Sequence, residues 1–75
     1  MQTCREIYEM ISQHCKCISI FICAHAWANE EGSLIADNMG EEDFLALFGD
    51  NTPTDWVLCT GEYNDAAIKI GFLFR

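Results

Sequence analysis

The chain has 75 residues, of which 51% are hydrophobic, and a formal net charge of −8. This length predicts one compact domain over residues 1–75, and the aromatic content is too high for a disordered acidic tail. The negative charge disfavours direct binding to nucleic acid, because the phosphates would be repelled.

The apolar run at residues 18–28 is well short of the roughly 20 residues that cross a bilayer, and the first residues do not follow the pattern of a signal peptide. We therefore expect a cytoplasmic protein that makes no contact with a membrane. The five cysteines are odd in number, so reduced thiols are the expectation.

The first elements predicted are an amphipathic helix and a strand. Thr3 and Glu6 have the spacing of a capping box, so a helix is expected from there to about Cys15. Its apolar stripe is formed by Ile7, Met10, Ile11 and His14. Residues 17–27 are β-branched or aromatic at alternating positions and predict a strand. Both of its faces are largely apolar, which indicates a central strand covered on both sides, or a sheet whose second face meets a partner.

A turn is expected at residues 29–32, then a short strand at residues 33–36 and a second helix. Asn38 is a candidate cap of that helix, acids occupy its first turn, and Gly49 ends it. Its apolar face is formed by Phe44, Leu45, Leu47 and Phe48.

After a polar loop at residues 49–54, strands at residues 56–60 and 67–74 predict a hairpin with its turn at residues 61–65. Helix is the alternative for residues 53–60, because proline suits a first helical position, but the following Trp, Val and Thr favour a strand. The last strand is expected beside the strand at residues 17–27. The fold class predicted is α+β, in the order α-β-β-α-β-β, with two helices on one face of a mostly antiparallel sheet.

Cysteines and histidines around the first strand raise a zinc alternative. The possible ligands are His14, Cys15, Cys17, Cys23 and His25. Structural zinc prefers two close pairs that are well separated in sequence, which is not the spacing here, so no metal is predicted. Cys17 and Cys23 are interpreted as core residues, and His14 and His25 as residues at the edge of the core. No P-loop, dinucleotide-binding or nucleophile-elbow motif is present, so neither an enzyme nor a cofactor is predicted.

Most of the acidic residues lie in one segment, residues 30–65, which contains no Lys or Arg. They are Glu30, Glu31, Asp37, Glu41, Glu42, Asp43, Asp50, Asp55, Glu62 and Asp65. Solubility alone is one explanation, since acids are common in turns and at helix N-termini. The missing cations favour another, in which the acids imitate a phosphate backbone and pair with Lys and Arg of a partner. Trp27, Trp56 and Tyr63 are candidate apolar anchors of this partner-binding surface.

In its size, its acidic clusters at residues 30–31 and 41–43, and its lack of catalytic motifs, the chain resembles the small acidic inhibitors that phages and mobile elements encode against host nucleases, such as anti-CRISPR and DNA-mimic proteins. The resemblance implies a stoichiometric inhibitor. Its partner would be a basic nucleic-acid-binding protein or complex, such as a CRISPR effector, in the host cytoplasm.

A rival hypothesis is an interaction or oligomerisation module, with a homodimer as one form. In this hypothesis the strand face of Phe21, Cys23, His25 and Trp27 forms the interface, and the acids keep the protein soluble. An apolar interface would persist at high salt, whereas an electrostatic one would weaken.

Overall fold

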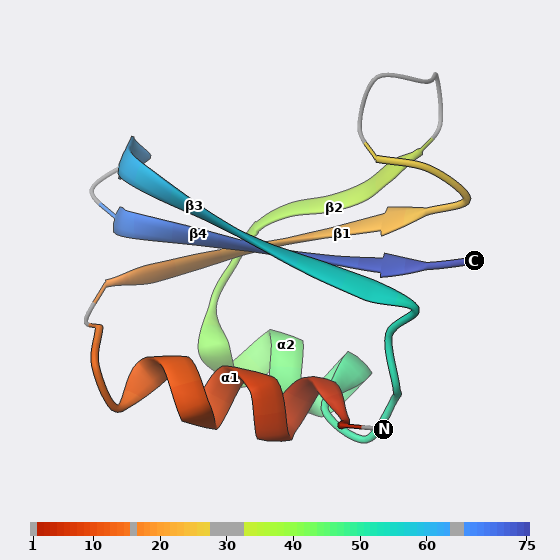
Figure 1. The fold of residues 1–75 in the computed structure, drawn as a ribbon, viewed down its shortest axis with the longest axis horizontal. Coiled ribbons are helices and arrows are strands. Elements are labelled where there is room, and N and C mark those ends of the chain that lie inside the picture. Colours follow the sequence, from red (N-terminus) through yellow and green to blue (C-terminus); the bar gives the residue numbers. More distant parts are fainter. Residues whose placement is uncertain (1, 16, 28–32, 64–65) are drawn as a thin grey trace.

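The residues that the structure describes form two helices and a four-stranded sheet, in the order that the sequence predicts (Figure 1). The computed structural model describes residues 2–15, 17–27, 33–63 and 66–75, with only the backbone of residues 62, 63 and 66. The elements are α1 (Cys4–Ser12), β1 (Ile18–Ala24), β2 (Leu34–Met39), α2 (Glu41–Phe48), β3 (Asp55–Tyr63) and β4 (Ala66–Phe74). The α+β class is thereby confirmed.

The strand order across the sheet is β2-β1-β4-β3. The central strands β1 and β4 run parallel, as a pair distant in sequence, while β2 and β3 pair antiparallel with them at the two edges. This confirms a mostly antiparallel sheet with the last strand beside the first. Both helices lie on the same face of the sheet, as Figure 1 shows.

The core lies between the helices and the sheet. Every second residue of the central strands points toward the helices, so Ile20 and Phe72 are fully buried there. The ring of Phe72 stacks on Phe44 of α2 with centroids 5.0 Å apart, and Phe44 also contacts Tyr8 of α1 at 5.7 Å. Aromatic contacts therefore join both helices to the sheet.

The capping box of α1 is confirmed, because Thr3 and Glu6 satisfy each other's backbone N–H groups at 2.9 and 3.3 Å. The α1 stripe is partly wrong. Its buried residues are Cys4, Ile7, Tyr8 and Ile11, whereas Met10 is 43% exposed and His14 is exposed. The helix turns the face containing Tyr8 toward Phe44, and it ends at Ser12 rather than near Cys15.

Strand β1 is shorter than residues 17–27. His25 has a left-handed backbone with φ of 73°, which ends the strand at Ala24 and leaves the His25 side chain exposed. Cys17 also has a positive φ, of 57°, and is exposed. The core interpretation is therefore wrong for Cys17 and correct for Cys23, which has no exposed surface.

The capping role expected of Asn38 is wrong. Asn38 belongs to β2 with a φ of 52°, and its Oδ1 accepts a hydrogen bond from the Ser19 hydroxyl at 3.1 Å. Gly40 caps α2 instead, without a side-chain hydrogen bond.

Residues 55–60 form a strand, so the helix alternative for this region is excluded. The predicted turn does not begin at residue 61, because β3 continues to Tyr63. Residues 64–65 lie outside the described part of the chain. The turn expected at residues 29–32 also lies outside it.

Candidate partner-binding surface

The acids of α2 form a compact exposed group. Glu41, Glu42 and Asp43 occupy the first turn of α2, and all three are exposed. Their position suits the helix, whose N-terminus carries a partial positive charge. Leu47 lies one turn after Asp43 and is 66% exposed. We call these four residues the acidic helix surface.

Two cations from outside residues 30–65 form ion pairs with acids of this segment in the folded chain. Arg5 Nε lies 3.6 Å from Asp50 Oδ1, and Lys69 Nζ lies 2.7 Å from Asp37 Oδ1. The hydrogen bond from Lys69 is the main cause that lowers the pKa of Asp37 below its usual value. Within the described ranges no ion pair involves residues 41–43. Among the described acids of residues 30–65, those without an ion pair are therefore concentrated in the first turn of α2.

The contact between α1 and α2 explains where Arg5 lies. The backbone N–H groups of Cys4 and Arg5 donate to the carbonyls of Asn51 and Gly49 at 2.8 and 2.9 Å. The N-terminus of α1 thus supplies the end of α2 with hydrogen-bond donors, and Arg5 adds a cation where the α2 dipole is negative. This leaves the opposite end of α2, with its three acids, as its negatively charged end.

Other acids lie on the opposite side of the molecule. The outer sheet face, away from the helices, includes Phe21, Cys23, Val57, Lys69, Gly71 and Leu73, as the strand registers show. Asp37 reaches this face through Lys69, and Asp55 is in register with Leu73. Asp55 also accepts a hydrogen bond from the N–H of Trp56 at 2.8 Å. The acids of the segment are thus divided between two faces.

Several predicted site residues cannot be placed in either group. Glu30, Glu31 and Asp65 lie outside the described residues, and only the backbone is described for Glu62 and Tyr63, at the end of β3.

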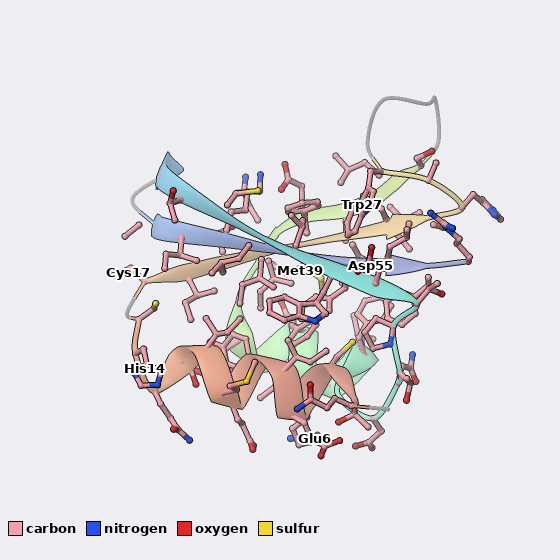
Figure 2. All side chains as sticks on the ribbon, viewed as in Figure 1. Glu6, His14, Cys17, Trp27, Met39 and Asp55 are labelled. Carbon is pink, nitrogen blue, oxygen red and sulfur yellow. The ribbon has the colours of Figure 1, made fainter. Side chains whose placement is uncertain are left out.

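The two candidate tryptophans point to different faces. Trp27 packs edge-on against Phe21 of the outer sheet face, with ring centroids 6.2 Å apart. Trp56 is packed against the core on the helix side of β3. In Figure 2 Trp27 lies on the side of the sheet away from α1. No single flat contact therefore includes both indoles.

Sequence reasoning missed the exposure of Leu47, Val57 and Leu58. For Leu47 a signal existed, because Phe44 and Phe48 lie one turn apart and suffice to line the inner side of a helix of eight residues. For β3 the signal was absent, since an edge strand and a central strand have the same alternating pattern.

Chemical features of other kinds are scarce in the described part of the chain. It contains no group of three His, Cys, Asp or Glu side chains placed to hold a metal ion. No helix among these residues is both long and apolar enough to span a bilayer. Burial raises the pKa of the Cys4 thiol to about 11, which disfavours its thiolate form.

Comparison with known proteins gave no match to any protein-family model, to any curated protein or to any solved structure. The functional argument therefore rests on the residues themselves.

Proposed function

We propose that the protein is a non-catalytic inhibitor that binds a basic nucleic-acid-binding protein or complex through the acidic helix surface. The observation that carries this proposal is the exposed turn of Glu41, Glu42 and Asp43 beside Leu47, without an ion pair within the described ranges.

Carboxylates pair with Lys and Arg through the same charge-assisted hydrogen bonds that phosphates accept. A site that binds the phosphates of DNA therefore suits an exposed row of acids. Leu47 adds an apolar contact at the centre of such a complex, where water is excluded and side-chain burial contributes most. Asp37 and Asp50 contribute less, because each already lies beside a cation of its own chain.

The test is affinity capture from lysate of the native host at low and high salt, with mass-spectrometric identification. The wild-type chain is compared with a triple variant, Glu41→Gln, Glu42→Gln and Asp43→Asn. The matched control is Glu9→Gln, which removes an exposed acid of α1. The three α2 acids together stabilise the helix by about 1–3 kcal/mol, so circular dichroism must confirm that the triple variant is folded.

Capture of a nucleic-acid-binding complex by wild type and the control, but not by the triple variant or at high salt, supports the proposal. Displacement of DNA from the captured complex then tests inhibition. Equal capture by the triple variant contradicts the proposal.

A second candidate is an interaction module that uses the outer sheet face. The observation in its favour is the exposed apolar surface beside Phe21 and Trp27, where Leu34 is 44% exposed and Val57 38%. The predicted interface needs correction, because Cys23 is fully buried and His25 lies beyond the strand. This candidate predicts capture that withstands salt and the triple variant but is lost in Trp27→Ser.

A further inference from the structure

The two edges of the sheet differ in how well they are protected against pairing with another strand. Unpaired backbone groups at an edge invite such pairing, and proteins discourage it with bulges, charges and short strands. Edge strand β2 has these devices: its pairing with β1 is irregular at two places, and Asp37 and Asn38 lie within it.

Edge strand β3 lacks these devices over most of its length. Its register with β4 is regular from Asp55 to Thr60 and shifts only after that. Residues 56–61 contain neither a charge nor a proline. From Val57 to Thr60 the outer side of β3 is thus a straight, uncharged stretch of sheet edge, whereas the N–H of Trp56 before it already donates to the Asp55 carboxylate.

Exposed apolar side chains lie on both faces of β3 at this stretch. Val57 is 38% exposed on the outer sheet face, and its neighbour Leu58 is 42% exposed on the helix side. One neighbouring strand would cover both side chains at once, whereas a partner lying on either face would cover only one of them.

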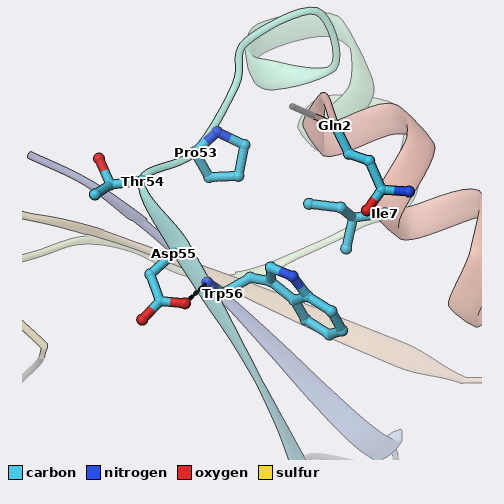
Figure 3. A pocket seen from close by; sticks show the side chains of 6 residues that line it. All are labelled: Gln2, Ile7, Pro53, Thr54, Asp55 and Trp56. Atoms are coloured by element: carbon cyan, nitrogen blue, oxygen red, sulfur yellow. Dashed lines mark hydrogen bonds between the residues drawn. The ribbon is translucent and has the colours of Figure 1, made fainter.

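A pocket of about 250 Å³ lies at the start of the same strand, between β3 and the N-terminal end of α1 (Figure 3). In this view the Trp56 indole, Ile7 and Pro53 enclose an apolar space with Gln2 at its rim, while the Asp55 carboxylate points away from it. A strand paired with β3 would carry every second side chain on this side of the sheet, and the pocket is large enough to hold one of them.

We propose that the open edge of β3 accepts an extended segment of a basic protein as an additional strand, with one apolar side chain of that segment in the pocket. Main-chain hydrogen bonds would give the affinity, and the pocket the specificity. This surface is separate from the acidic helix surface, because α2 packs against β1 while β3 lies at the far edge of the sheet.

Charge decides between a basic segment and a second copy of this chain. Two copies would each bring a net charge of −8, and their repulsion opposes association. A segment with cations at its ends would instead be attracted, in particular to Asp55 where β3 begins.

The experiment is a titration of the ¹⁵N-labelled protein with a synthetic peptide of alternating valine and threonine with lysine at both ends. One control peptide has the same side chains but N-methylated amides along one edge, which removes its hydrogen-bond donors. A second has glutamate at both ends. The protein variants are Leu58→Lys and, on the other edge, Ile35→Lys, which is 54% exposed in wild type.

We expect chemical-shift changes along residues 56–60 and slowed exchange at the Leu58 amide, which faces outward from β4. Binding should be about tenfold weaker for both control peptides and for Leu58→Lys, with Ile35→Lys close to wild type. The N-methylated peptide keeps the test valid if Leu58→Lys fails to fold. Equal binding of that peptide, shifts confined to α2 or β2, or self-association through β3 would each overturn the proposal. Loss of capture by the α2 triple variant leaves this result unchanged, so the two proposals can fail separately.

Discussion

The close approach of Phe21 to Gly71 gives a prediction that can be worked out in detail. Gly71 lies on the outer sheet face in register with Phe21, and a methyl group added there would overlap the Phe21 ring. In Gly71→Ala the ring must therefore swing away. It would lose its edge contact with Trp27, worth about 0.5–1.5 kcal/mol, and its position 5.3 Å from Lys69 Nζ, worth about 0.5–1 kcal/mol.

The expected loss is about 1–2.5 kcal/mol, offset by about 0.5–1 kcal/mol because alanine restricts the unfolded chain more than glycine does. In a Phe21→Ala background there is no ring to displace, so Gly71→Ala is expected to be neutral or slightly stabilising. Urea unfolding of the wild type, both single variants and the double variant gives the coupling. Costs that add within about 0.5 kcal/mol would refute the reasoning, because additive effects mean that the two positions do not interact.

Three further predictions follow from local contacts. Thr3→Ala removes the capping box of α1 and is expected to lower the free energy of unfolding by about 1 kcal/mol in urea titrations; a change below about 0.3 kcal/mol would contradict it. The pKa of Asp37 is lowered in the folded state by the hydrogen bond from Lys69, so its stabilising effect is complete above the unfolded-state pKa of about 3.9 and is lost as the pH falls through the folded-state value. Urea unfolding across acidic pH is therefore expected to show a weaker pH dependence in Lys69→Met, and an unchanged one would refute the assignment. In alkylation followed by peptide mapping, the exposed Cys17 should react in the native protein, while the buried Cys4 should react only after unfolding; equal rates would contradict the burial of Cys4.

The parts of the fold that were predictable follow from local patterns. Alternation of apolar residues identified both central strands, and in β4 the alternating residues Ile70 and Phe72 are fully buried on the helix side. The spacing of Thr3 and Glu6 located the start of α1 correctly, because the capping interaction is made within the same turn.

The errors occurred where tertiary contacts decide. Asparagine suits both a helix cap and a left-handed backbone. Asn38 has the left-handed backbone, and its side chain accepts a hydrogen bond from the Ser19 hydroxyl there. The orientation of α1 depends on Tyr8 reaching Phe44, a contact between residues distant in sequence. The end of β1 depends on the backbone of His25, for which the sequence carried no signal.

For the candidate site, the negative charge of the partner-binding surface could be predicted from the sequence, but the distribution of that charge over the folded surface could not. The segment without cations suggested one continuous anionic surface, yet Arg5 and Lys69 come from outside it and pair with Asp50 and Asp37. Counting charged residues along the sequence does not reveal such ion pairs, because they join residues that only folding brings together.

This redistribution has a consequence for how a partner would be held. An ion pair within the chain already satisfies part of a carboxylate's hydrogen-bonding capacity, so a partner cation gains less from Asp37 than from an acid without such a pair. Acids at a helix N-terminus are stabilised by the dipole of the backbone without needing a cation. A short helix with acids in its first turn is thus a stable way to present negative charge that has no ion pair within the chain. Leu47 lies on the same helix, so a partner attracted by these acids would bury its side chain.

Replacing Leu47 by serine should therefore speed dissociation of the complex with little effect on its association rate, whereas neutralising Glu42 and Asp43 should mainly slow association. Surface plasmon resonance with the captured partner separates the two rates, and equal effects of both changes on association would show that Leu47 is not an anchor.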